Sequence, residues 1–261
     1  MSNLITNWRK IAIGVTLISA LAYMMVFLPE HTFKQLAKED GILEWTCTLL
    51  FFITAILFFV LFFRNNSFAK IEVANFYNTY TKRIWFLLLA LLFIFLTGEE
   101  ISWGQRLLGL ETPEEIAANN EQGEINFHNN ALWHLYDKDG NRKSGLALHL
   151  TAKRIFIYIF TIFMLFLPLT VKFVPFVRNL VKRFHLPVPV MELGFMFVAN
   201  VVLYLIFKPI ASYDKEIARA LSEVQELNFS LVLFFLPFVW FGVGKVAEHS
   251  SVSGKVERVR S

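Results

Sequence analysis

Residues 42–63 read ILEWTCTLLFFITAILFFVLFF, an apolar run whose one charged residue, Glu44, stands near its start. A hydrocarbon layer of about 30 Å is crossed by about 20 helical residues, so this run is long enough to span a membrane. Five other stretches are long enough, or nearly so, to be spans, at residues 11–28, 84–103, 155–174, 188–207 and 229–243. The sequence therefore predicts an all-α integral membrane protein with six transmembrane helices, forming a single polytopic domain over residues 1–261.

The composition supports this class of protein. Hydrophobic residues make up 56% of the chain and charged residues 18%, the mean hydropathy is +0.51, and phenylalanine occurs 29 times. Soluble domains average about 45–50% apolar and about 25% charged residues. The sole cysteine, Cys47, excludes an intrachain disulfide and a cysteine-based zinc site. The composition thus excludes a soluble enzyme, a disordered chain, a coiled coil and a disulfide scaffold.

The distribution of charge predicts the orientation in the membrane. Basic residues dominate the N-terminal segment, the second and fourth connections and the C-terminal tail, whereas carboxylates gather on the first, third and fifth connections. Basic segments stay on the cytoplasmic side of a membrane, so both termini are expected there. This distribution explains the isoelectric point of about 9.1 without a nucleic-acid partner. The compact chain favours a bacterial cytoplasmic membrane, and its first helix is expected to remain uncleaved.

The long third connection, residues 98–152, is expected to form a partly membrane-embedded cap on the outer face. It opens with the adjacent carboxylates Glu99 and Glu100, which follow an unusually short apolar run. Ionisable groups at membrane depth are functional candidates, so these two residues and Arg106 are predicted to be catalytic. If the helix continues, Glu99, Ser102 and Arg106 share one face. The alternative is a fixed ion pair between a glutamate and Arg106.

Several polar side chains are predicted to line a substrate pocket beside this acid pair. Glu44 opens the second span at a similar depth, and the cap supplies amide, hydroxyl and indole groups. The predicted substrate-binding residues are Glu44, Ser102, Trp103, Gln105, Asn126 and Asn130. The alternative is that Trp103 anchors the membrane interface and that the amides only hold the cap together.

Three histidines on the outer side, His128, His134 and His149, are candidate ligands of a divalent metal such as zinc, iron or manganese. His128 and His134 do not lie on one face of a straight helix. A metal site therefore requires the cap to fold back and to combine ligands from two or three segments.

These features predict a membrane-embedded enzyme with an outward carboxylate and histidine pocket, acting by metal-assisted hydrolysis on a lipid or lipid-linked substrate. In that reaction the histidines hold the metal, and Glu99 or Glu100 takes a proton from the metal-bound water. A non-catalytic alternative is a subunit of an envelope complex or a small-solute binder, in which the same residues form a structural network. A small transporter is the second alternative. A membrane-protein partner or a second copy of the chain is compatible with each of these functions.

Overall fold

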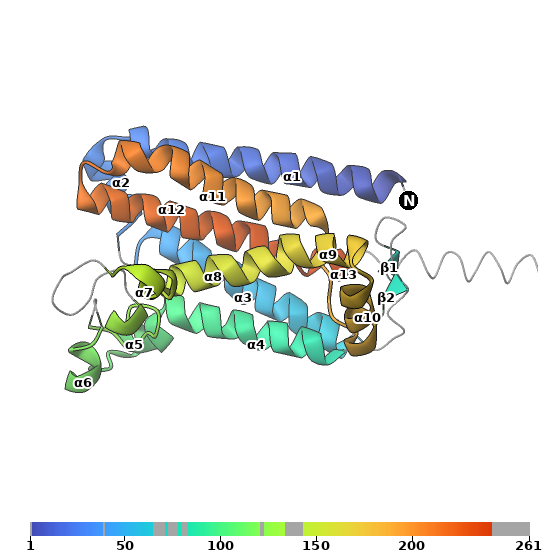
Figure 1. Ribbon diagram of the computed structural model, residues 1–261. Coiled ribbons are helices and arrows are strands. Elements are labelled where there is room, and N and C mark those ends of the chain that lie inside the picture. Colours follow the sequence, from blue (N-terminus) through green and yellow to red (C-terminus); the bar gives the residue numbers. More distant parts are fainter. Residues whose placement is uncertain are drawn as a thin grey trace, which may run out of the picture.

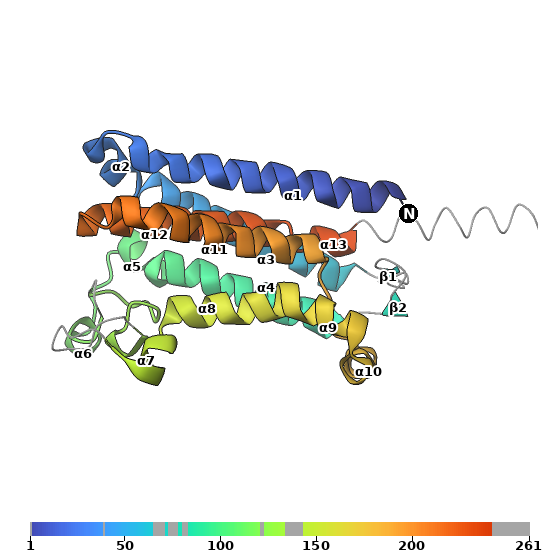
Figure 2. The same ribbon diagram turned by 45° about the horizontal axis from the view of Figure 1, so that its top comes forward.

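The computed structural model describes residues 2–38, 40–64, 71–72, 78–79, 83–120, 123–133 and 143–241. Long helices run side by side through the molecule (Figures 1 and 2). They are α1 (Ser2–Tyr23), α3 (Ile42–Phe63), α4 (Arg83–Glu100), α8 (Ala152–Thr161) continued by a π-helical turn (Ile162–Phe166) and α9 (Leu167–Phe173), α11 (Met191–Ala211) and α12 (Lys215–Phe234). The chain is thus a helical membrane-type bundle, as the apolar runs predict.

Five segments of the described chain are long and apolar enough to cross a membrane. They are Asn7–Phe27, Ile42–Phe63, Ala152–Phe173, Met191–Ala211 and Lys215–Phe241. Helix α4 packs along α3 (Figure 1), and its 18 residues end on two glutamates. The surface of the bundle carries exposed apolar side chains such as Leu21, Phe63 and Val202. Such a surface suits a hydrocarbon environment.

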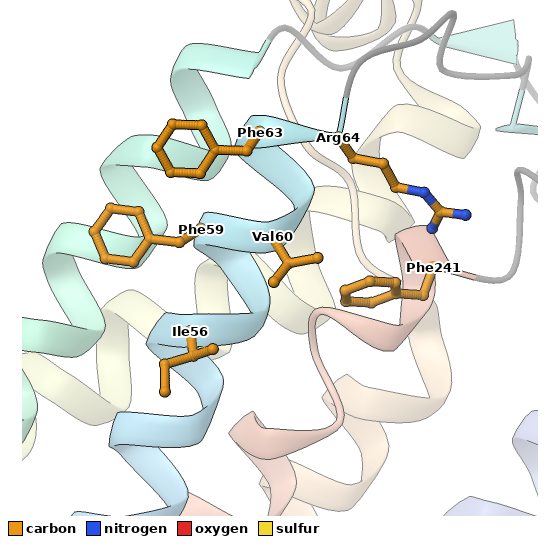
Figure 3. A pocket seen from close by; sticks show the side chains of 6 residues that line it. All are labelled: Ile56, Phe59, Val60, Phe63, Arg64 and Phe241. Atoms are coloured by element: carbon orange, nitrogen blue, oxygen red, sulfur yellow. The ribbon is translucent and has the colours of Figure 1, made fainter.

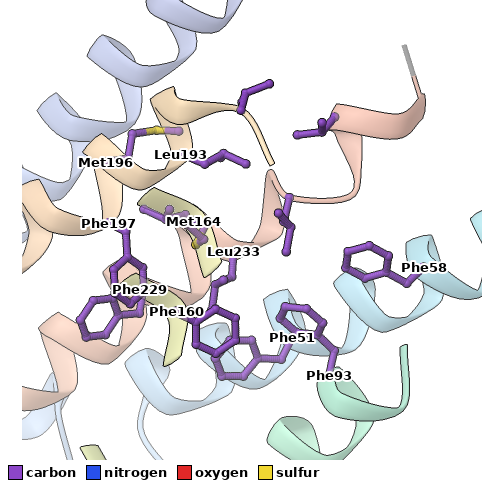
Figure 4. Close-up of a cluster of buried hydrophobic side chains, with 14 of the residues drawn as sticks. Phe51, Phe58, Phe93, Phe160, Met164, Leu193, Met196, Phe197, Phe229 and Leu233 are labelled. Carbon is purple, nitrogen blue, oxygen red and sulfur yellow. The ribbon is translucent and has the colours of Figure 1, made fainter. Parts of the chain in front are cut away.

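Phenylalanine packing fills the centre of the bundle (Figure 4). Phe58 of α3 stacks on Phe93 of α4 with ring centroids 5.6 Å apart. Phe197 of α11 stacks on Phe229 of α12 at 4.5 Å. Large aromatic side chains contribute both buried area and ring–ring contacts, so they fix the spacing between neighbouring helices.

The backbone of α11 lies very close to the π-helical turn that follows α8. A Cβ atom on Gly194 would lie 2.5 Å from the carbonyl oxygen of Met164, so only glycine allows this contact. A polar clamp adds to the packing of α11: Tyr23 donates to Asn200 Oδ1 at 2.5 Å, and Asn200 Nδ2 donates to the carbonyl of Gln225 at 3.1 Å. The clamp ties α1, α11 and α12 together.

Short elements gather at the two ends of the bundle (Figure 1). One end carries α2 (Glu30–Leu36), α5 (Gln105–Leu108), α6 (Glu114–Ala117) and α7 (Gly145–His149), and we call it the cap end. The opposite end carries α10 (Pro175–Phe184), α13 (Phe238–Phe241) and an antiparallel pair, β1 (Ile71–Glu72) with β2 (Asn78–Thr79). The remaining short turns are Met24–Phe27, Ser102–Gly104 and Ala131–Trp133.

Asp214 fixes the start of α12 at the cap end. Its carboxylate accepts hydrogen bonds from the backbone N–H groups of Glu216 at 2.7 Å and Ile217 at 3.0 Å. Lys34 of α2 lies 3.5 Å from Asp214 and 2.7 Å from Glu216. The N–H of Ile217 is the main cause that lowers the pKa of Asp214, while Glu216 and Glu30 raise the pKa of Lys34.

The charge of Asp214 gives a pH-dependent contribution to stability. Asp214→Asn keeps an N-capping acceptor but removes the charge, whereas Asp214→Ala removes both, so Asp214→Ala is expected to lower the Tm more at pH 7. The folded pKa lies below the ordinary value of 3.8. The stability from the charge is therefore complete above that value and is lost as the pH falls through the lowered pKa. A Tm gap between wild type and Asp214→Asn that persists in full at lower pH would contradict this assignment.

Candidate functional site

Helix α4 ends at Glu100 in an abrupt left-handed turn. Ser102, Trp103 and Gly104 have φ values of 47°, 55° and 77°, a conformation that costs energy for residues with a side chain. The turn brings the Trp103 ring back over Gly98, where a Cβ would lie 2.8 Å from the ring. The helix does not continue to Arg106 in one piece, so the polar stripe expected from a continuous helix does not form.

Glu99 is the centre of a hydrogen-bond network that holds the cap against α4. The residue is only 5% exposed. Its Oε2 accepts from the backbone N–H groups of Phe127 and His128, both at 2.8 Å, and lies 3.2 Å from His128 Nδ1. Its Oε1 accepts from Trp103 Nε1 at 2.8 Å. Both carboxylate oxygens thus accept hydrogen bonds from the protein itself, which supports a structural role for Glu99.

A second layer of the same network joins the turn after α4 to residues 120–126. Ser102 Oγ donates to Glu124 Oε2, and Asn126 Nδ2 lies 3.0 Å from both of these oxygens. Asn120 Nδ2 donates to the Asn126 carbonyl at 2.9 Å. These four residues are buried or nearly so, so the network replaces the water that their polar groups would otherwise bind.

Gln105 extends this network along the cap. Its Oε1 accepts from the Ile125 N–H at 2.7 Å, and its Nε2 donates to Thr112 Oγ1. Asn130 Oδ1 accepts from the Leu132 N–H at 3.0 Å. The structure therefore brings together four of the predicted substrate-binding residues, Ser102, Trp103, Gln105 and Asn126, around Glu99, and engages them in holding the cap. The Arg106 side chain lies outside the described part of the structure.

The candidate metal ligands are not brought together among the residues that the structure describes. His128 Nδ1 faces Glu99, whereas His149 Nδ1 lies 2.8 Å from the Tyr158 hydroxyl at the start of α8. His134 lies outside the described residues. Within the described ranges there is no group of three or more His, Cys, Asp and Glu side chains that could hold a metal ion. The predicted site includes His134, so it stays a prediction.

Glu100 faces a different environment from its neighbour. It interacts electrostatically with Glu226 and Glu223 of α12 and with Glu44 of α3, and it lies beside Cys47. Carboxylates from α3, α4 and α12 thus lie near enough to interact at the cap end of the bundle. All four residues are half-buried. We call Glu44, Glu100, Glu223 and Glu226, with Lys153, the acid–lysine cluster.

Lys153 supplies positive charge to this cluster from the start of α8. Its ammonium group lies 3.2 Å from Glu226 Oε1, contacts Ser222 Oγ, and sits 5.2 Å from the centre of the Tyr204 ring. Ser222 Oγ is also 3.3 Å from Glu226 Oε1. Lys153 and Arg219 both attract Glu223 electrostatically. The cluster therefore combines proton acceptors, a cation and a hydroxyl within a small volume, as acid–base chemistry requires.

Sequence reasoning missed Glu223 and Glu226 as site residues because it began the last span at residue 229. It missed Lys153 because its partners, Glu226 and Ser222, lie on that distant helix. The structure begins α12 at Lys215, so both glutamates lie well within the helix. A signal was present: Ile217, Leu221 and Val224 continue the helical spacing of apolar residues toward the glutamates and are buried. Extending the helix by this spacing would have placed the two carboxylates in the bundle.

Comparison of the chain with models of protein families, with curated proteins and with solved structures finds no match.

Proposed function

We propose that the protein is a membrane-embedded enzyme that hydrolyses a lipid or lipid-linked substrate at the acid–lysine cluster. The observation that carries the proposal is the ammonium group of Lys153, which contacts Glu226 and Ser222. Glu226 and its neighbour Glu223 interact electrostatically with Glu100 in turn. Several carboxylates at membrane depth are costly unless they serve a function or bind a compensating charge. Glu100 ends α4 and Lys153 lies at the start of α8, so both are at the cap end of the bundle.

Exposed leucines on the cap favour a lipid substrate. Leu107 and Leu108 of α5 are 64% and 71% exposed, and Leu146 of α7 is 77% exposed. Leu110 and Leu132 are also exposed. Apolar side chains displayed in this way on short helices suit insertion into the headgroup boundary of a leaflet. A cap inserted there would lead a lipid headgroup toward the cluster while its chains stay in the bilayer.

In the proposed reaction Glu100 is the general base. It takes a proton from a water molecule as the water oxygen attacks the ester carbon or phosphorus and the bond to the leaving oxygen breaks. Lys153 stabilises the negative charge that develops on the substrate, and a protonated carboxyl of the cluster gives a proton to the leaving oxygen. These steps use only side chains of the acid–lysine cluster.

The orientation in the membrane is part of the proposal. We infer six spans, with α4 as the sixth beside the five apolar segments, and both termini on the cytoplasmic side of a bacterial inner membrane. The end of the bundle opposite the cap carries the N-terminal helix start, α10 and α13 (Figure 1). Its described basic residues include Arg9, Lys10, Arg64, Arg83, Lys172, Arg178, Lys182 and Arg183, which supports a cytoplasmic position for that end.

Lys153→Met tests the proposed site directly. The protein is reconstituted in vesicles containing phosphatidylglycerol, phosphatidylethanolamine and a polyprenyl phosphate ester, and released products are measured. We expect Lys153→Met to lower turnover by about 100-fold or more, because the developing charge loses its cation. Lys38→Met, which removes an exposed lysine at the same end, should leave turnover unchanged. Equal turnover in wild type and Lys153→Met would overturn the proposal.

A non-catalytic role is the second candidate, and the Glu99 network favours it. This carboxylate contacts Trp103, Phe127 and His128 of the cap, as expected for a scaffold that presents the cap to a partner protein. In that case Lys153 and Glu226 form only a link between α8 and α12. The absence of any turnover, together with a lower Tm in Lys153→Met, would support this second candidate.

A further inference from the structure

An apolar hollow lies on the bundle surface at the end opposite the cap. It has a volume of about 520 Å³ and is lined by Ile56, Phe59, Val60, Phe63, Arg64 and Phe241. Figure 3 shows Val60 facing the Phe241 ring, with the Arg64 side chain extending over that ring. Ligand pockets in proteins commonly have volumes of about 300–1,000 Å³, so the hollow can hold part of a small molecule.

Arg64 is the only charged residue among those that line the hollow. It follows directly on the last residue of α3, where a membrane-spanning helix passes from hydrocarbon to the headgroup layer. Its guanidinium group lies 5.8 Å from the centre of the Phe241 ring. The hollow thus has an apolar floor in the span and a cation at the level where lipid phosphates lie.

The surrounding charge favours an anionic occupant. The described part of this end carries Arg83 at the start of α4, and Lys182 and Arg183 on α10. Among the side chains that the structure describes at this end, Glu192 of α11 is a carboxylate. Basic residues near a membrane surface attract anionic lipids, and each adds to the attraction.

We propose that this hollow is a binding site for an anionic phospholipid of the adjoining leaflet. One acyl chain lies against Val60, Ile56 and Phe241, and the phosphate pairs with Arg64. Guanidinium groups bind phosphate oxygens through paired hydrogen bonds, which a diffuse positive charge does not provide. The site lies at the far end of the bundle from the acid–lysine cluster and is independent of the proposed enzymatic activity.

Native mass spectrometry of the detergent-purified protein, titrated with phosphatidylglycerol or phosphatidylcholine, tests this site. We expect wild type to retain phosphatidylglycerol in preference to phosphatidylcholine. Arg64→Gln should weaken phosphatidylglycerol binding about fivefold or more, because the lipid phosphate loses its paired hydrogen bonds to the guanidinium group. Val60→Trp fills the hollow and should weaken binding of both lipids, with a Tm measurement showing that the variant is folded.

Arg183→Gln is the matched control. Arg183 also lies over a phenylalanine ring, that of Phe184 at 5.7 Å, but it lines no part of the hollow. Its loss should leave phosphatidylglycerol binding within twofold of wild type. An equal loss in Arg64→Gln and Arg183→Gln would show that diffuse charge alone attracts the lipid and would overturn the site. A dimer that disappears in Val60→Trp would instead identify the hollow as a contact between two copies of the chain.

Discussion

Replacing Glu99 by Gln is expected to lower the free energy of unfolding by about 2–4 kcal/mol, because a buried carboxylate that accepts several hydrogen bonds loses its charge and one of its acceptor oxygens. Two backbone donors, Phe127 and His128, converge on one oxygen and the Trp103 indole on the other. An amide NH₂ placed at either position faces a donor. Thermal unfolding in detergent should show a fall in Tm of several degrees or more.

Glu115→Gln is the control for this change. It makes the same chemical substitution in the cap, on an exposed side chain of α6, and should leave stability within about 0.5 kcal/mol of wild type. A Glu99→Gln protein that melts with wild type but has lost turnover would show that Glu99 acts in catalysis, as the sequence first predicted. The structural role assigned to this residue would then be wrong.

Replacing the adjacent Glu100 by Gln should lower turnover but not stability, whereas Glu99→Gln should lower stability. Turnover is expected to fall by about 100-fold or more, the usual contribution of a general base. The Tm should stay equal to wild type or rise, because the change removes one of four mutually repelling carboxylates. Turnover by reconstituted protein and thermal unfolding of the same preparation measure both effects.

The two variants together separate the two candidate functions. The enzyme predicts that Glu99→Gln loses stability and Glu100→Gln loses turnover. A scaffold without catalysis predicts that neither variant has a turnover to lose and that Glu100→Gln changes only the Tm. Full turnover in folded Glu100→Gln would remove Glu100 from the mechanism and leave Glu223 and Glu226 as the carboxylates to test.

Apolar patterning was enough to predict the helical membrane class. The run at residues 42–63 becomes α3 with the same bounds, because a long uncharged segment satisfies its backbone only as a helix in hydrocarbon. The last span was predicted less well: α12 begins at Lys215 rather than near residue 229. The first half of α12 carries Arg219, Glu223 and Glu226 and so contains no continuous apolar run, which is why the predicted span began only after it.

The identity of the polar candidates also followed from the sequence, but their roles did not. Glu99 and Glu100 stood out because two acids end a short apolar run. Adjacent residues on a helix point about 100° apart, so one can face the cap and the other the bundle. Which neighbours each meets depends on segments far away in the chain: Phe127 and His128 for Glu99, and α12 for Glu100.

By itself, the sequence determined a helical membrane protein with its polar groups concentrated at one end, because hydrophobicity and charge act through composition and local spacing. Only the tertiary structure decided that hydrogen bonds enclose Glu99 and that Lys153 reaches Glu226. It also decided that His128 faces Glu99 whereas His149 lies beside Tyr158. Hydrogen bonds and ion pairs act over a few ångströms. Their partners therefore depend on how distant segments pack, which no local pattern specifies.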